Sequence, residues 1–183
     1  MKKTKFFSLL MALLCVFTMS VTFAACGDDD DDPIKPGSGV VDKTIKKIDF
    51  TYKLELSQTY LDIADITITY LDENGNEQTE AITSTTWTKT ISRNGVPASF
   101  CAKPSFTLKE GVDATHKYDF SSNYGYDYNT LNAKGEVVTS NKNGKTPSTK
   151  GVKGEKLAEF LQLAAKNNTI KCSVDAKGFP IGE

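Results

Sequence analysis

Hydrophobic and polar residues alternate through much of the chain, the pattern of strands that bury one face and expose the other. The longest such run is 48–56, and further runs cover 100–108 and 118–128. In the longest run the apolar positions are Ile48, Phe50, Tyr52, Leu54 and Leu56. Together with glycine-containing turns at 72–76 and 133–135, the pattern predicts about eight antiparallel strands.

Two stretches depart from this alternation. Between residues 61 and 70 the apolar positions change parity, which we interpret as a bulge or kink near Ala64 and Asp65. The stretch 141–153 is rich in Lys, Gly, Ser and Thr, which predicts a mobile loop. The polar strand at 77–83 is expected at the edge of a sheet or on a solvated face.

One stretch has helical periodicity. Leu157, Phe160, Leu161 and Ala164 fall at i, i+3, i+4 and i+7, and they predict a single helix over 154–167. Many antiparallel strands and one helix predict an all-β fold for residues 42–183. We expect an immunoglobulin-like β-sandwich with the C-terminal helix packed across one end. A lipocalin-like β-barrel is the alternative, and it would enclose a ligand cavity.

The first 25 residues have a different pattern. Three lysines among the first five residues precede an uncharged, mostly apolar run over 6–25. This is the layout of a secretory signal peptide, although about 20 apolar residues could also span a bilayer. The run ends in Phe-Ala-Ala-Cys at 23–26, which resembles the lipobox of bacterial lipoproteins. The resemblance implies that residues 1–25 are removed and that Cys26 is lipidated and becomes the new N-terminus.

Five consecutive acidic residues follow the cysteine after one glycine: Asp28, Asp29, Asp30, Asp31 and Asp32. Like charges in a block repel one another, so residues 26–41 are expected to form a flexible tether. The run also resembles the export signal of Bacteroidota surface lipoproteins, which implies a lipid anchor in the outer membrane with the domain facing the medium. A periplasm-facing domain is the alternative. Two or more acyl chains on Cys26 would hold the protein stably at the membrane.

Composition and residue inventory argue against several functions. The formal net charge is −1 with signs interspersed, so nucleic acid is not expected as a partner. His116 is the only histidine, which argues against a histidine zinc site or a Ser-His-Asp triad. No motif for a metal or a cofactor is present, and no spacing singles out a catalytic pair among the carboxylates, such as Asp62, Asp65, Asp119 and Asp127. We therefore expect no enzymatic activity and no cofactor.

Cys101 and Cys172 are the two cysteines of the folded domain. An oxidising compartment would allow them to form a disulfide. Side-chain alternation, however, places Cys101 on an outward face and Cys172 on an inward face. This arrangement favours two separate thiols over a disulfide.

Candidate binding residues lie in the strand over 118–128. Tyr124, Tyr126 and Tyr128 share one face of it, and Trp87 is the single tryptophan. Such rings either form the buried face of a sheet or, where they extend beyond the core, stack against sugars. Gly125 would leave the opposite side open to close approach. The predicted function is a non-catalytic binding or accessory module for an extracellular glycan or protein. The alternatives are a lipocalin-like small-ligand carrier and a hydrolase.

Overall fold

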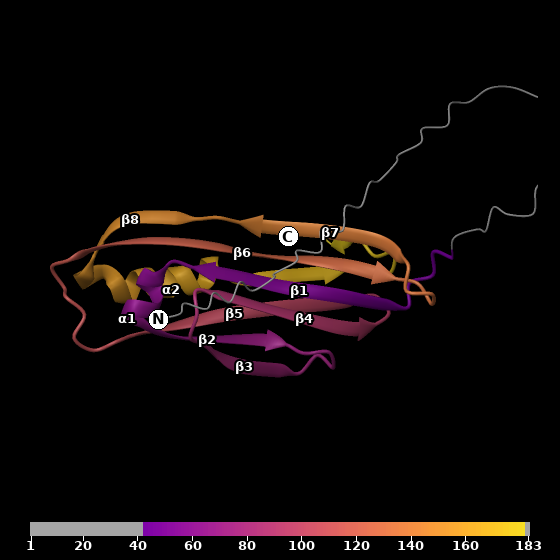
Figure 1. The fold of residues 1–183 in the computed structure, drawn as a ribbon, viewed down its shortest axis with the longest axis horizontal. Helices are drawn as coiled ribbons and strands as arrows, with labels where there is room; N and C mark the ends of the chain where they lie inside the picture. The colour runs from indigo at the N-terminus through magenta and orange to yellow at the C-terminus, as the bar shows by residue number, and fades with distance from the viewer. Residues whose placement is uncertain (1–41, 182–183) are drawn as a thin grey trace, which may run out of the picture. The chain divides into compact units, whose positions relative to one another are not determined.

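Residues 42–181 are described by the computed structural model, and their ten strands form two antiparallel sheets (Figure 1). The predicted signal peptide, Cys26 and the aspartate run lie outside these residues. Sheet A has the order β4–β1–β6–β7, with β8 also pairing with β6: β4 (Thr86–Asn94), β1 (Lys47–Leu56), β6 (Lys117–Leu131), β7 (Val137–Lys145) and β8 (Ser148–Lys153). Sheet B has the order β10–β9–β5–β2–β3: β10 (Pro180–Ile181), β9 (Ile170–Val174), β5 (Ala98–Leu108), β2 (Ala64–Leu71) and β3 (Glu77–Ile82).

The core lies between the two sheets and is built from the inward positions of their strands. All five apolar positions of the run 48–56 are buried in β1. Phe50 of sheet A stacks on Phe100 of sheet B, with ring centroids 4.0 Å apart and an angle of 5° between the planes. The predicted sandwich architecture with one C-terminal helix is therefore confirmed. The alternative of a closed, lipocalin-like barrel is wrong, because the described strands form two separate sheets.

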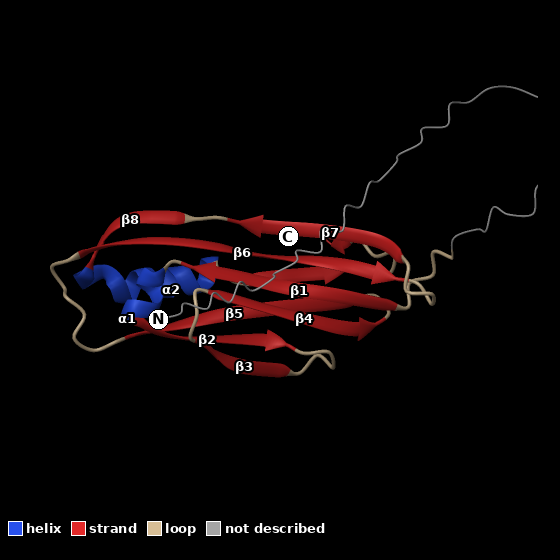
Figure 2. Cartoon of the chain, viewed as in Figure 1, coloured by secondary structure: helices blue, strands red, loops and turns tan. Residues whose placement is uncertain are grey.

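Two helices lie at one end of the sandwich (Figure 2). α2 (Leu157–Asn167), preceded by the short turn η1 (Gly154–Lys156), confirms the helix predicted over 154–167. α1 (Gln58–Ile63) is a second, shorter helix. Aromatic rings from both helices and from two strands fill this end, with neighbouring centroids 4.4–5.1 Å apart: Tyr60, Phe106, Phe120 and Phe160.

The parity change between residues 61 and 70 is caused by α1. The predicted bulge at Ala64 and Asp65 is wrong, because residues 58–63 are helical and regular strand geometry begins at Ala64. The backbone N–H of Ala64 caps the helix by donating to the carbonyl of Tyr60. Six residues are too few for helical periodicity to stand out against the alternation on either side.

The stretch 141–153 is not a loop, so that prediction is wrong. β7 pairs with β6 from Tyr124 to Leu131, and β8 pairs with β6 from Lys117 to Ser121. Together they form one long, interrupted edge of sheet A. An edge strand has water on one side, so a polar composition is compatible with strand structure here. The polar strand predicted at 77–83 is β3, and it lies at an edge of sheet B as expected.

The C-terminal residues of the domain are fastened to sheet A. Tyr128 Oη on β6 and Thr139 Oγ1 on β7 each donate a hydrogen bond of 3.0 Å to the carbonyl of Gly178. Gly178 lies in the turn that returns the chain from β9 to β10, and its φ of 88° favours glycine. These bonds hold the β9–β10 hairpin of sheet B against β6 and β7 of sheet A.

Candidate functional site

The edge of the sandwich formed by β3 and β4 is closed by one carboxylate. Glu80 of β3 accepts hydrogen bonds from Tyr70 Oη (2.6 Å), Trp87 Nε1 (3.1 Å) and Lys89 Nζ. The bond from Lys89, followed by that from Tyr70, holds the pKa of Glu80 at about 2. The same contact raises the pKa of Lys89 to about 12. Because Trp87 and Lys89 belong to β4, this Glu80 cluster (Tyr70, Glu80, Trp87 and Lys89) joins the two sheets.

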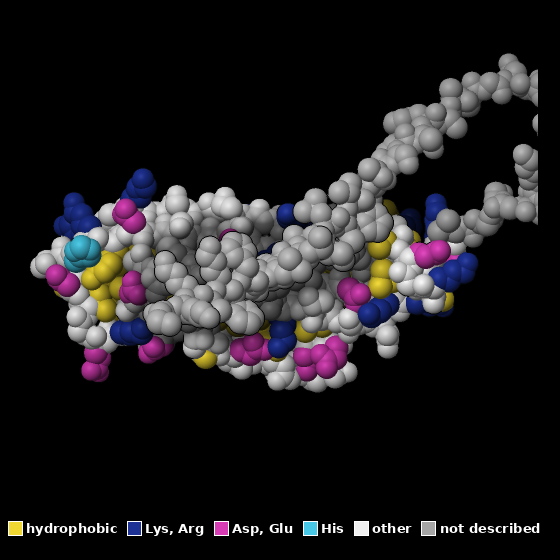
Figure 3. Space-filling model, in the orientation of Figure 1, with side chains coloured by type: hydrophobic (Ala, Val, Ile, Leu, Met, Phe, Trp, Pro, Cys, Tyr) yellow, Lys and Arg dark blue, Asp and Glu magenta, His cyan; other side chains and the backbone are white. Residues whose placement is uncertain are grey.

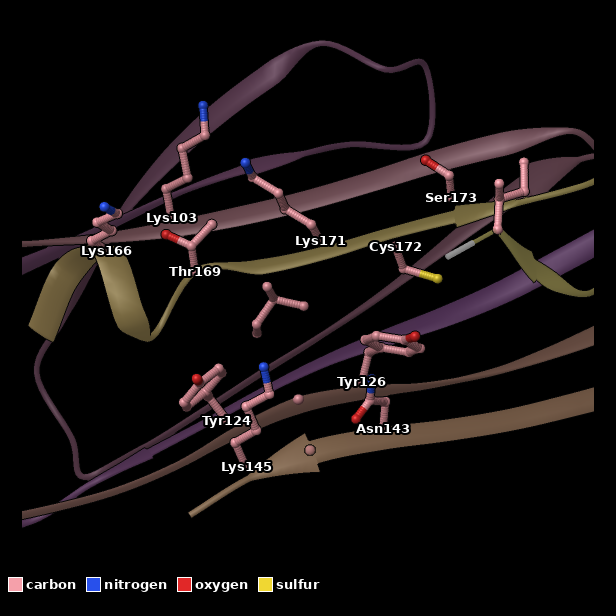
Figure 4. A pocket seen from close by; sticks show the side chains of 14 residues that line it. Lys103, Tyr124, Tyr126, Asn143, Lys145, Lys166, Thr169, Lys171, Cys172 and Ser173 are labelled. Atoms are coloured by element: carbon pink, nitrogen blue, oxygen red, sulfur yellow. The ribbon is translucent and has the colours of Figure 1, made fainter. Parts of the chain in front are cut away.

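The opposite edge, where β6 and β7 face β9 and β10, is open and holds a pocket of about 640 Å³ (Figure 4). We call this pocket the edge groove. Its volume falls within the range of about 300–1,000 Å³ that is usual for ligand sites. Sheet A contributes Tyr124, Gly125, Tyr126, Asn143, Gly144 and Lys145 to the lining. The other lining residues are Lys103, Lys166, Thr169, Ile170, Lys171, Cys172, Ser173 and Ile181.

The groove exists because sheet B is shorter than sheet A along this edge. β9 has five residues and β10 has two, whereas β7 alone has nine. Inward-facing side chains of β6 and β7 therefore extend beyond the strands that would cover them. The pairing of Tyr124 with Lys145 and of Tyr126 with Asn143 places each of these pairs side by side on the inward face.

The aromatic candidates separate into core residues and one groove residue. Tyr126, Tyr128 and Trp87 are only 4%, 2% and 8% exposed, so they are part of the core. Tyr126 stacks on Phe50 with ring centroids 5.0 Å apart, and it also forms part of the groove lining. Tyr124 is only partly buried. Of the four candidates, Tyr124 is therefore the one that extends beyond the core into a site where a ligand could lie.

Lysines dominate the charge of the groove. Among the described residues, no Asp, Glu or His lines it, but four lysines do: Lys103, Lys145, Lys166 and Lys171. In Figure 4 the ammonium group of Lys145 extends into the groove beside Tyr124. The ammonium groups of Lys103 and Lys171 point away from the tyrosines, on the far side of β9. The groove therefore has the charge of one lysine at its centre, while two of the four lysines direct their charge to the outer face of sheet B.

Gly125 lies in the wall of the groove between Tyr124 and Tyr126. A glycine is required at this position because the backbone of β7 lies too close for a side chain. A Cβ atom at this position would lie 2.1 Å from the carbonyl oxygen of Asn143 and 2.6 Å from the Cα of Gly144. No side chain fits at such distances. Gly125 and Gly144 are paired in the sheet, so β7 can lie close against β6 directly behind the two tyrosines. The close approach expected at Gly125 is thus made by the backbone of β7.

The two domain cysteines lie on opposite faces of sheet B and are not joined to each other. Cys172 is buried and faces the groove, whereas Cys101 is half-buried on the outer face. Burial raises the pKa of the Cys101 thiol, which makes that thiol less reactive at neutral pH. The prediction of two separate thiols agrees with this arrangement.

The other residues considered for catalysis lie outside the groove. His116 packs edge-on against Tyr118, with ring centroids 4.7 Å apart. Asp127 forms an ion pair with Lys53, and Asp119 accepts a hydrogen bond from the backbone of Gly151. Within residues 42–181, no three side chains of His, Cys, Asp or Glu are grouped so that they could hold a metal ion.

Several groove residues could not be found from the sequence. Asn143 and Lys145 fall in the stretch predicted as a loop. Lys166 lies in the predicted helix but outside its apolar stripe, where a lysine is expected to face solvent. Residues 139–145 are polar or glycine at every position, so the sequence has no alternation that would predict a strand there.

Comparison with protein-family models, with curated proteins and with solved structures yields no match. The site is therefore interpreted from its own geometry. Across residues 42–181, no helix has the length and apolar character needed to cross a membrane.

Proposed function

We propose that this protein is a lipid-anchored lipoprotein of the outer-membrane surface, and that its β-sandwich binds an extracellular glycan in the edge groove without catalysing a reaction. The anchor rests on the resemblance of residues 23–26 to a lipobox and of the five aspartates to an export signal. The binding function rests on the groove. The observation that carries it is the partly exposed Tyr124 on the wall of a pocket of about 640 Å³.

A sugar ring suits this wall better than a purely apolar ligand does. The face of a tyrosine ring packs against the C–H groups of a sugar, and its hydroxyl can form hydrogen bonds with sugar hydroxyls. Around Tyr124 the lining adds the Lys145 ammonium, which can donate to sugar hydroxyls, and the Thr169 hydroxyl, which donates to the carbonyl of Ala165 at 3.0 Å and can still accept a hydrogen bond. A pocket with a mixture of aromatic and polar side chains fixes both the position and the orientation of its ligand.

Binding is favoured over hydrolysis by the groove lining. Glycoside hydrolysis in most families uses two carboxyl groups that flank the scissile bond, and within residues 42–181 no carboxylate lines the groove. A lipocalin-like carrier would hold its ligand inside a closed barrel. Here the space between the sheets is filled by stacked rings such as Phe50 and Phe100. The edge of the sandwich is the place where a ligand fits.

A glycan array tests this proposal directly. The full-length protein, purified in a non-ionic detergent, is applied to an array of neutral and acidic glycans, alongside Tyr124→Ala. An aromatic contact with a ligand contributes about 0.5–1.5 kcal/mol, so the variant should bind its best glycan about two- to tenfold more weakly.

Tyr118→Ala is the matched control. Tyr118 belongs to the same strand and is likewise partly buried, but it lies outside the groove lining. Its replacement should leave glycan affinity unchanged. The proposal fails if the intact protein binds no glycan, or if both variants reduce binding equally. Binding to a protein partner in place of a glycan would likewise overturn it.

A further inference from the structure

We infer that the ligand of the edge groove is an acidic oligosaccharide, one whose sugar rings carry carboxylate groups. This inference rests on the proposed function and adds the charge of the ligand to it. Lys145 and Lys166 carry the argument, because no carboxylate of the described residues lines the groove with them. The chain as a whole has 23 acidic and 22 basic residues. Its overall composition therefore does not account for a described lining that has lysines and no carboxylate.

The positions of the lysines match a ligand that extends along the groove. Lys145 pairs with Tyr124 across the sheet, so a sugar ring stacked on Tyr124 would bring a ring carboxylate near the Lys145 ammonium. Lys166 stands in the last turn of α2, at the mouth of the groove. Lys103 and Lys171 lie on adjacent strands, with their ammonium groups on the far side of β9. Only a polymer that continues out of the groove and over β9 would meet these two charges.

In the described part of the chain, neither the Lys145 nor the Lys166 ammonium group forms an ion pair or a side-chain hydrogen bond, whereas Lys53 and Lys89 are each paired with a carboxylate. A cleft lined by charges of one sign concentrates the electric field and attracts ions of the opposite sign. The unneutralised groove therefore favours an anionic ligand.

Carboxylates of β3 lie at the edge opposite the groove. Glu77 and Glu80 belong to this strand, and Figure 3 shows acidic side chains along the lower side of the molecule, where β2 and β3 lie in Figure 1, as well as at both ends. Glu80 is paired there with Lys89, so this edge has charges of both signs, whereas the charged residues of the described groove lining are lysines.

One feature favours an acidic sugar over other anions. The aromatic wall formed by Tyr124 and Tyr126 suits a ring-shaped ligand, which an acidic peptide does not supply at each residue. A lysine ammonium binds any anion as a compact point charge, so the choice between anions comes from this wall.

The test compares three probes with the full-length protein in detergent micelles. The first is an oligogalacturonate, whose sugar rings all carry carboxylates. The second is its methyl ester, which has the same rings without the charge. The third is a polyglutamate peptide of the same charge without the rings. Dissociation constants are measured by isothermal titration calorimetry at low and at high salt.

We expect the oligogalacturonate to bind at least about tenfold more tightly than its methyl ester, and its affinity to fall as salt screens the lysines. Exposed charge pairs each contribute up to about 1 kcal/mol. The double variant Lys145→Gln with Lys166→Gln should therefore weaken binding of the oligogalacturonate roughly tenfold. Lys142→Gln with Lys150→Gln is the matched control, because both lysines are exposed on β7 and β8 outside the groove.

Failure of this inference is distinguishable from failure of the proposed function. Equal affinity for the acid and its ester, with no effect of the groove lysines, would overturn the acidic ligand and leave glycan binding intact. Tight binding of polyglutamate that Tyr124→Ala does not weaken would identify an acidic peptide instead and overturn the inference. No binding of either sugar probe, together with an empty glycan array, would overturn both.

Discussion

Replacing Tyr126 with alanine separates the structural role of the tyrosine strand from its binding role. Tyr126 is 4% exposed, and its ring lies 5.0 Å from Phe50 and 6.3 Å from Tyr128. Tyr124 lies two residues away on the same face of β6 but is only partly buried. We therefore expect Tyr126→Ala to destabilise the fold severely and Tyr124→Ala to do so only slightly.

The magnitude follows from what each ring contacts. Removing a buried aromatic ring costs about 3–5 kcal/mol, because the remaining cavity adds to the lost transfer free energy. Tyr126 has ring neighbours on its own sheet and closes the floor of the groove, so the upper part of that range applies. Tyr124 has the groove on one side, and we expect its removal to cost about 1 kcal/mol. In a domain of this size, 1 kcal/mol corresponds to roughly 3–5 °C in Tm.

Chemical and thermal denaturation of the full-length protein and the two variants, followed by circular dichroism, measures both costs. Tyr126→Ala should lower Tm by roughly 10–20 °C and Tyr124→Ala by less than about 5 °C. The reasoning is refuted if Tyr126→Ala costs less than about 1 kcal/mol, since its ring would then not be part of the core. It is also refuted if the two variants are equally destabilised.

Glu80, Gly125 and Cys26 each provide a further test. The pKa of Glu80 is about 2 in the folded protein against an ordinary 4.5, so its contribution to the free energy of unfolding is complete above about pH 4.5 and is lost as the pH falls toward 2. Because the Glu80 side chain is 35% exposed, Glu80→Gln should lower the free energy of unfolding at pH 7 by only about 1–2 kcal/mol. In denaturation measured from pH 2 to 7, the variant should also lose less stability at low pH than the parent protein. An unchanged dependence on pH would contradict the role of the Glu80 cluster. Gly125→Ala should cost about 1–3 kcal/mol by denaturation and weaken ligand binding, because its Cβ would displace β7. Gly144→Ala is the control with a nearest contact of 3.3 Å, and an equal loss in both variants would argue against the close approach at Gly125. Cys26→Ala should abolish incorporation of a radiolabelled fatty acid, whereas Cys15→Ala should not; the reverse result would place the lipobox elsewhere.

The core and the main helix could be predicted from the sequence because local periodicity determines them. The five apolar residues of β1 alternate over nine positions, and each is buried. The apolar stripe of α2 spans two turns, and its residues pack inward. α1 was missed because six residues give too short a pattern, and its effect on parity was mistaken for a bulge at Ala64.

The groove could not be predicted, because it depends on where distant strands end. The partial exposure of Tyr124 results from the short β9 and β10 opposite it, and side-chain parity within β6 contains no information about their length. Likewise, the strand structure of β7 depends on its pairing with β6 and not on the composition of β7 itself. Lys145 reaches the groove only through that pairing.

The most direct test of the account is to locate the ligand on the protein. The ring resonances of the tyrosines, labelled with ¹³C in the full-length protein, are followed by NMR while the oligogalacturonate is added. We expect the resonances of Tyr124 to shift in proportion to occupancy and those of Tyr118, at the helical end of the same strand, to remain unchanged. Binding that leaves Tyr124 unshifted, or that shifts Tyr118 instead, would contradict the assignment of the edge groove as the ligand site.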